Sequence, residues 1–196
     1  MNLHLYDFDG TLTKKDSMIE FLRSIHSRKT FFLRLIMSIP FYFLYKFKII
    51  KREKFKIFFL KIFLRDKTHD ELKSNSEDFA REFVDKMNPH VIEHLNKNKN
   101  IATQCLVTAS LDIWMAPIAN LLGLHLISTN SNFDEDGKFI GLNGKNCNFS
   151  EKVKRVNQKF DLDSFDKTIV YGDSAGDKEM MKIADKRQWD FFKNYL

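Results

Sequence analysis

The first part of the chain combines one short apolar run with a long helical pattern. Residues 3–6, Leu-His-Leu-Tyr, are typical of a buried strand. From residue 16 to residue 87, apolar side chains recur at the three- and four-residue spacing of helices. Residues 31–64 are its most apolar part, and we expect Pro40 and the basic pair Lys51-Arg52 to interrupt them.

After about residue 88 the pattern changes to alternating strands and helices. Apolar runs predict strands at 101–107, 124–128, 168–171 and 188–192. Helical spacing predicts helices at 89–95, 112–122, 150–160 and 177–184, the third with Ser150 as its N-cap, and a turn predicts a hairpin around 134–137. Such alternation predicts an α/β fold, a Rossmann-like doubly wound parallel sheet. We therefore expect a catalytic core of residues 1–15 and 88–196, with an inserted helical cap at 16–87.

Composition is that of a globular protein with one core and a modest insertion. The chain has 196 residues, 43% of them hydrophobic and 30% charged. Two cysteines, Cys105 and Cys147, are too few for a disulfide framework, which favours a reducing compartment. The first residues lead directly into acidic Asp7 and Asp9 and do not resemble a signal peptide. We expect a cytoplasmic protein.

Positive charge is concentrated in the apolar helical segment. Residues 23–67 hold 13 Lys and Arg against Glu53 and Asp66, a net charge of +11 in a chain whose total is +6. The same segment holds eleven aromatic residues. This asymmetry indicates an anionic partner for that part of the chain. No nucleic-acid-binding motif accompanies the charge, so we do not expect a nucleic-acid partner.

Two acidic clusters each follow a predicted strand. The first is Asp7-Phe8-Asp9-Gly10-Thr11 and the second is Gly172-Asp173-Ser174-Ala175-Gly176-Asp177. In a doubly wound sheet the carboxyl ends of the central strands face one crevice. Four carboxylates there would repel one another unless a cation neutralised them, and oxygen ligands suit Mg²⁺. Acidic residues beside glycine can also simply form turns and helix caps, but two such clusters favour a metal site.

Two further elements suit an anionic ligand. Thr108-Ala109-Ser110 lies between the strand expected to end at Val107 and the next helix, where a hydroxyl and backbone amides can bind an anion. Lys152 lies in the first turn of a helix, where a cation opposes the helix dipole unless an anion is fixed nearby. N-capping and solvation are the ordinary roles of such residues.

Together these four elements resemble, in order, the four motifs of the haloacid dehalogenase superfamily. The helical insertion directly after the first motif is similar to the cap of its phosphoserine phosphatase-like branch, and Asn146-Cys147 followed by Glu151-Lys152 resembles that branch's third motif. The second aspartate, Asp9, is characteristic of the phosphatases. The resemblance covers nearly the whole chain and implies a Mg²⁺-dependent phosphoric monoester hydrolase.

The resemblance also implies a role for each residue. Asp7 would be the nucleophile that forms an aspartyl-phosphate, and Asp9 the general acid and base. Mg²⁺ would be held by Asp7, the backbone carbonyl of Asp9 and Asp173, with Asp177 supporting this shell. Phosphate would be bound by Thr108, Ala109, Ser110 and Lys152.

The residues of the cap are compatible with two classes of substrate. In phosphoserine phosphatases a cap glutamate follows the nucleophile by nine residues, where this chain has Asp16, and only Arg52 approximates the cap arginine. The apolar cap is also similar to that of the phosphatidylglycerophosphatase C members of the branch. The substrate is then either a small phosphorylated metabolite or a phospholipid headgroup, the latter with peripheral contact of residues 31–64 with the inner membrane face.

Three alternatives remain at this point. The aromatic residues of the cap could pack its interior while the basic residues form a solvated face. The chain could keep the fold as a non-catalytic membrane- or partner-binding module. It could also transfer the phosphoryl group to another alcohol rather than to water.

Overall fold

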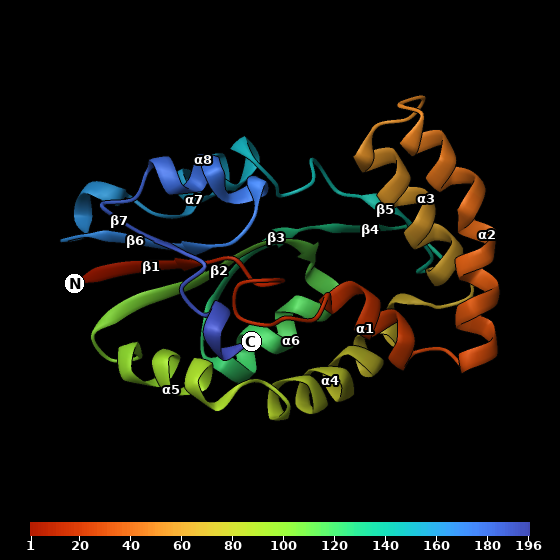
Figure 1. The fold of residues 1–196 in the computed structure, drawn as a ribbon. Helices are drawn as coiled ribbons and strands as arrows, with labels where there is room; N and C mark the ends of the chain where they lie inside the picture. The colour runs from red at the N-terminus through yellow and green to blue at the C-terminus, as the bar shows by residue number, and fades with distance from the viewer.

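A five-stranded parallel sheet forms the centre of the molecule in the computed structural model, which describes residues 1–196 (Figure 1). Its strands are β1 (Asn2–Tyr6), β2 (Ala102–Leu111), β3 (His125–Thr129), β6 (Thr168–Gly172) and β7 (Lys186–Trp189). They lie in the order β3-β2-β1-β6-β7, and every neighbouring pair is parallel. The order reverses at β1, so β1 and its neighbours β2 and β6 direct their carboxyl ends to the switch point of the sheet.

Helices cover both faces of this sheet. On one face lie α5 (Pro89–Asn98) and α6 (Asp112–Leu122), and on the other lie α7 (Ser150–Lys159) and α8 (Lys178–Lys182). Alternate side chains of β1 point to opposite faces of the sheet. Leu3 and Leu5 pack in one cluster with Val156 of α7, whereas Tyr6 packs in the other cluster with Val91 of α5. Short 3₁₀ turns occupy Leu162–Ser164, Ala175–Asp177 and Lys193–Tyr195. The predicted doubly wound α/β fold is confirmed.

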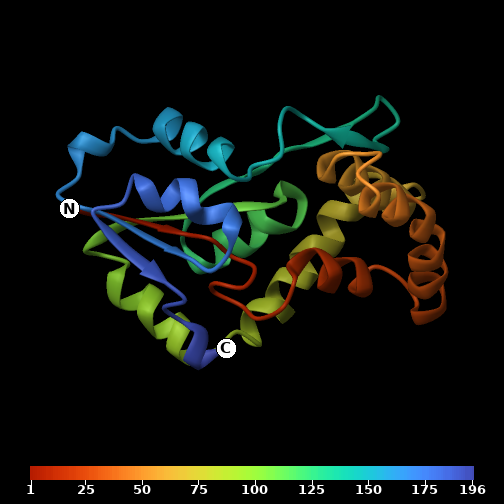
Figure 2. The ribbon, with the colours of Figure 1, turned by 45° about the horizontal axis from the view of Figure 1, so that its top comes forward.

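A helical insertion follows β1. It contains α1 (Ser17–Ser24), α2 (Arg28–Lys46), α3 (Arg52–Leu64) and α4 (His69–Asp85), and α2 and α3 project beyond the end of the sheet. A second insertion, the antiparallel hairpin β4 (Ser131–Phe133) and β5 (Phe139–Leu142), extends from the core to α3 (Figure 2). Helix α4 lies within the predicted cap but packs along α6 of the core. The boundary between a cap of residues 16–87 and the core therefore stays a prediction.

The interior of the cap is aromatic. Phe31 of α2 and Phe59 and Phe63 of α3 are buried, with the Phe59 and Phe63 rings 4.7 Å apart. The outer side of α2 is equally apolar but exposed. None of the helices is both long enough and apolar enough to cross a membrane.

Four local predictions differ from the structure. The first strand after the cap runs on to Leu111, so residues 108–110 lie within β2 rather than after it. Helix α2 continues through Pro40, whose ring is exposed and whose missing N–H leaves only the carbonyl of exposed Ile36 without its helical donor. The break predicted at Lys51-Arg52 is confirmed.

The other two differences lie in the C-terminal half. The N-cap of α7 is Phe149, at a φ of 50°, and not Ser150. Strand β7 ends at Trp189 because Asp190 adopts a φ of 52° and turns the chain. Phe192 was expected in this strand, but it packs instead against Tyr171 with ring centroids 5.8 Å apart.

Trp114 joins the cap to the core and offers a test of the fold. It is fully buried in α6 and stacks on Phe21 of α1 with centroids 5.2 Å apart. We expect Trp114→Ala to lower the free energy of unfolding by about 3–5 kcal/mol, measured by urea denaturation, because it leaves a large cavity. Leu121→Ala, an exposed position on the same helix, should change it by less than about 0.5 kcal/mol. Similar losses in both variants would contradict this packing.

Candidate active site

A cavity of about 850 Å³ lies at the carboxyl end of the sheet, between the core and the cap. The core contributes Asp7 and Asp9 after β1, residues 108–110 of β2 and Lys152 of α7. The cap contributes α3, with Arg52 and Lys56 among its lining residues. Each core element reaches the cavity because parallel strands end at the same edge of the sheet.

Three carboxylates meet beside this cavity. Asp7, Asp173 and Asp177 each place one carboxylate oxygen within 4.8 Å of the other two. Burial raises the pKa of Asp7 to about 7 and also raises the pKa of Asp173. The donor set is all oxygen and carries more negative charge than Lys152 alone can balance, which fits a hard divalent cation such as Mg²⁺.

Two glycines make this close approach feasible. Gly10 has a φ of 92°, and a Cβ at this position would lie 2.3 Å from an oxygen of Asp173. A Cβ on Gly172 would lie 2.7 Å from the Cβ of Asp177. Only glycine at both positions leaves room for the two carboxylates beside the backbone.

Lys152 is buried between two of the carboxylates. Its Nζ donates to Asp7 Oδ1 at 2.5 Å and to Asp177 Oδ1 at 2.7 Å, and its side chain is 2% exposed. Burial alone would lower the pKa of Lys152, but the charges of Asp7 and Asp177 raise it above its ordinary value. The ammonium therefore stays charged, and it fixes the Asp7 side chain at the end of β1.

The Asp9 carboxylate points away from this cluster. It accepts hydrogen bonds from the Ser17 backbone N–H at 2.7 Å, the Ser17 hydroxyl at 3.0 Å and the Ser110 hydroxyl at 2.7 Å. Trp114 Nε1 donates to the Ser17 hydroxyl at 3.2 Å, which orients that group towards Asp9. Burial raises the pKa of Asp9 although these donors oppose the shift. Such a carboxyl group is suited to hold and release a proton.

The predicted phosphate-binding residues lie at one end of the cavity. Thr108, Ala109 and Ser110 all line it, as does Lys152. The Thr108 hydroxyl oxygen accepts a hydrogen bond from the Ser110 backbone N–H at 3.1 Å. The Ser110 hydroxyl is directed to Asp9, so its contact is with the expected acid and base rather than with open space.

Sequence reasoning missed Ser17 and Lys56. Ser17 is the first residue of α1, directly after the N-cap Asp16, and its hydroxyl donates to Asp9 at 3.0 Å. Lys56 Nζ donates to the Ala109 carbonyl at 2.5 Å and to Asn146 Oδ1 at 2.7 Å, which ties α3 to the core. Burial lowers the pKa of Lys56 to about 8. Nothing in the sequence separates Lys56 from the other basic residues of the cap, because its role depends on the tertiary contact.

Known structures share this fold. A protein of unknown function from Bordetella pertussis Tohama I is 24% identical, with 95% of this chain and 88% of that chain covered at a TM-score of 0.79. A phosphoserine phosphatase solved as a phospho-aspartyl intermediate analogue is 19% identical, with 94% and 84% covered and a TM-score of 0.63. At these identities the similarity establishes the fold.

Sequence comparison establishes the family. Protein CicA of Caulobacter vibrioides is 34% identical over 194 residues, which cover 96% of this chain and 85% of the relative. The model of the haloacid dehalogenase-like hydrolases matches residues 5–182, a span that contains every residue lining the cavity. The predicted family is confirmed, and the chain belongs to the haloacid dehalogenase-like hydrolases.

Proposed function

We propose that the chain is a Mg²⁺-dependent phosphatase that hydrolyses a phosphate monoester through an aspartyl-phosphate on Asp7. The observation that carries this proposal is the pairing of two differently held carboxylates at the end of β1. Asp7 is bound by Lys152 beside Asp173 and Asp177, whereas Asp9 is held apart by Ser17 and Ser110. One carboxylate is thus placed to attack and the other to transfer a proton. The shared fold with a phosphoserine phosphatase supports the same reaction.

The reaction has two steps. In the first, a carboxylate oxygen of Asp7 forms a bond to phosphorus as the ester P–O bond breaks, and Asp9 gives a proton to the leaving oxygen. In the second, water attacks phosphorus, its proton passes to Asp9, and the bond to Asp7 breaks to release phosphate. Lys152 and the Thr108 end of β2 would stabilise negative charge on the phosphoryl oxygens.

Mg²⁺ would be held by Asp7, Asp173 and the backbone carbonyl of Asp9, with Asp177 supporting the site. When bound, the ion supplies positive charge that lets an anionic carboxylate approach an anionic phosphate. Asp177 is already engaged by Lys152 and by the backbone N–H and hydroxyl of Ser174, at 3.0 and 2.8 Å. These contacts suit a residue that orients the site.

The cap side of the cavity favours a substrate with an anionic or polar leaving group. Lys51, Arg52 and Lys56 line it, together with Phe55 and Phe59. Asp16 lines it as well, although its carboxylate caps α1 by accepting from the Ile19 backbone N–H at 3.0 Å. A basic and aromatic wall accepts either a small phosphorylated metabolite or a phospholipid headgroup, and the lipid-phosphate alternative remains part of this proposal.

The non-catalytic alternative, in which the fold serves only to bind a membrane or a partner, has less support. Every side chain that the reaction needs is present: Asp7, Asp9, Thr108 and Lys152 line the cavity, and Asp173 and Asp177 lie beside Asp7. Transfer of the phosphoryl group to another alcohol uses the same first step and differs only in the acceptor of the second.

We expect Asp7→Asn to reduce phosphate release from p-nitrophenyl phosphate by about three orders of magnitude or more, because an amide cannot form the covalent intermediate. The circular dichroism spectrum should be unchanged. Asp78→Asn, the same substitution at an exposed position of α4, should retain full activity. Near-normal turnover by the Asp7 variant would show that another residue is the nucleophile.

Metal dependence gives a second test. EDTA should abolish activity, and excess Mg²⁺ should restore it. Mg²⁺ should also raise the melting temperature of the wild type, since a ligand that binds only the folded state stabilises it. Asp173→Asn should weaken this thermal shift and require about tenfold more Mg²⁺ for activity. Activity that survives exhaustive chelation would contradict the metal site.

Lys56 gives a third test. Lys56→Met should raise the KM for an anionic phosphate ester by about tenfold, because a charged hydrogen-bond donor is lost from the cavity wall. Lys54→Met, a neighbouring position on α3 outside the cavity, should leave the KM unchanged. An equal KM in both Lys variants would exclude a role for Lys56 in binding.

The same residue predicts a pH dependence. Burial lowers the pKa of Lys56 most, and of the titratable groups that act on this pKa, Arg52 lowers it, whereas Asp9, Cys147 and Asp16 raise it. Lysine is charged below its pKa, so its contribution to binding should be present at neutral pH and lost as the pH rises through about 8. The KM of the wild type should therefore rise over this interval, whereas that of Lys56→Met should stay flat. Parallel profiles would assign the change to another group.

A further inference from the structure

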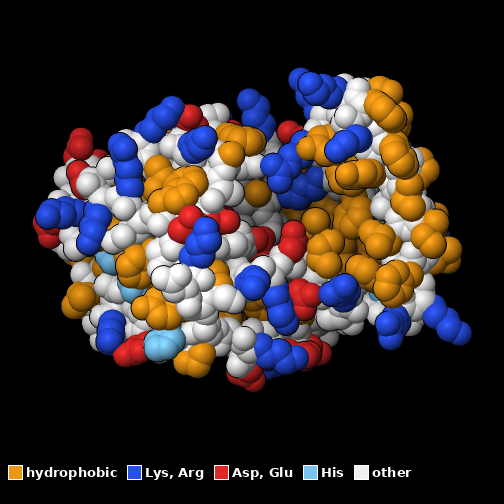
Figure 3. Space-filling model, viewed as in Figure 1, with side chains coloured by type: hydrophobic (Ala, Val, Ile, Leu, Met, Phe, Trp, Pro, Cys, Tyr) orange, Lys and Arg blue, Asp and Glu red, His pale blue; other side chains and the backbone are white.

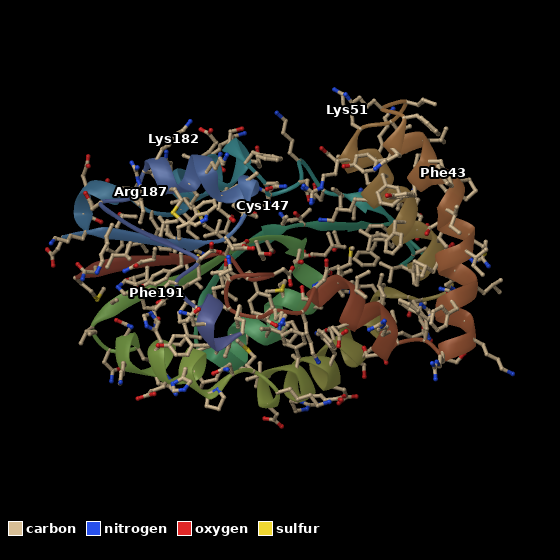
Figure 4. The ribbon with its side chains drawn as sticks, in the orientation of Figure 1. Phe43, Lys51, Cys147, Lys182, Arg187 and Phe191 are labelled. Carbon is tan, nitrogen blue, oxygen red and sulfur yellow. The ribbon has the colours of Figure 1, made fainter.

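Helix α2 exposes most of its apolar side chains on the side away from α3. Phe32, Ile36, Ile39, Phe43 and Phe47 are spaced by three or four residues, so they lie on one side of the helix, which we call the α2 outer face. Their exposed fractions run from 45% for Ile39 to 70% for Phe47. From residue 32 to residue 44 every exposed position is apolar. Figure 3 shows hydrophobic side chains along the side of the molecule formed by α2, and Figure 4 labels Phe43 on this helix.

The two polar residues in the middle of α2, Arg34 and Ser38, point inward. Arg34 is 4% exposed, and its guanidinium holds Asp66 through two contacts of 2.6 Å while also donating to the Phe63 carbonyl. Ser38, 4% exposed, donates to the Leu35 carbonyl at 2.7 Å. A soluble helix normally has the opposite arrangement. The contacts of Arg34 with Phe63 and Asp66 hold one side of α2 against α3, so the opposite, apolar side is exposed to solvent.

Basic residues flank the outer face. Arg28 and Lys29 precede Phe32 at one end of the face, and Lys46, Lys48 and Lys51 surround and follow Phe47 at the other end. No acidic residue occurs anywhere from residue 21 to residue 52. Lys51 lies in the loop at the tip of the α2–α3 pair, beyond Phe43 (Figure 4). An apolar strip with cations at both ends matches the interfacial region of an anionic bilayer, where acyl chains lie below negative headgroups.

Charge also separates this partner from a second copy of the chain. Two outer faces packed together would bring two basic rims into contact, and like charges at an interface repel. A bilayer containing anionic lipid offers both the apolar layer and the countercharge. We propose that the α2 outer face docks the protein onto the surface of an anionic membrane, with α2 lying in the plane of the interface.

Docking would place the cavity near the headgroups. Lys51 and Arg52 line the cavity and also belong to the basic tip of the cap. The side of the cap that meets lipid is therefore continuous with the wall of the proposed active site. This docking does not depend on catalysis, so the experiment that tests it measures only the binding of the protein to vesicles.

The test is flotation of the purified chain with phosphatidylcholine vesicles, with and without phosphatidylglycerol. We expect the wild type to float only with the anionic vesicles, and high salt to weaken this binding. Ile36→Ser/Phe43→Ser should reduce the bound fraction by at least about tenfold, since it removes two apolar side chains from the interface. Lys46→Gln/Lys48→Gln should also reduce the fraction bound to the anionic vesicles.

The matched control is Ile101→Ser/Leu121→Ser, which removes two exposed apolar side chains from the surface of the α/β domain, outside the cap. This variant should bind vesicles as the wild type does. The circular dichroism spectrum and the midpoint of urea denaturation should be unchanged in all these variants and serve as the measure of folding. Wild-type protein that stays with the unbound fraction, or outer-face variants that float normally, would overturn the proposal. So would a dimer that dissociates in Ile36→Ser/Phe43→Ser without any vesicle binding.

Discussion

The buried ammonium of Lys152 is the interaction on which the site depends. It lies between Asp7 and Asp177, which follow two different strands of the sheet, and it comes from a helix that belongs to neither. A buried charge without partners is very costly, so the ends of β1 and β6 and the start of α7 must stay in register with one another. Gly10 and Gly172 allow this by admitting the carboxylates against the backbone. The geometry of the acidic cluster thus follows from one salt-bridged lysine.

The cavity has walls of opposite charge, and this shapes what it can bind. The floor contributes the carboxylates of Asp7 and Asp9, with Asp173 and Asp177 beside Asp7, an oxygen donor set that fits a divalent cation. The cap contributes Lys56 and Arg52, which suit the remainder of an anionic molecule. Lys56 also links α3 to Ala109, so the residue that adds charge to the cap wall also holds the cap against the core. The contact between cap and core and the positive charge of the cap wall therefore depend on the same side chain.

The sequence predicts those parts of the site whose position follows from their place directly after a strand. Asp7, Asp9, Asp173 and Asp177 could be placed because each follows a strand, and parallel strands share one carboxyl edge. Asp9 was expected beside Asp7, but its partners were not, since Ser17 reaches it through the fold of α1 and Trp114 acts from a distant helix. The register shift that carries β2 on to Leu111 was equally hidden, because it depends on pairing with β3 rather than on local propensity.

In the cap, too, the sequence pattern alone does not predict the tertiary contacts. The pattern from Phe31 to Leu64 is apolar on nearly every side of its helices, so periodicity could not say which side would be buried. Arg34 of α2 binds Asp66, two residues after the end of α3, and Phe31 of α2 packs on Phe63 with ring centroids 5.3 Å apart. These long-range contacts separate an interior aromatic core from an exposed aromatic surface. Both exist here, on opposite sides of the same helix, and only the inner one is satisfied by contacts within the chain.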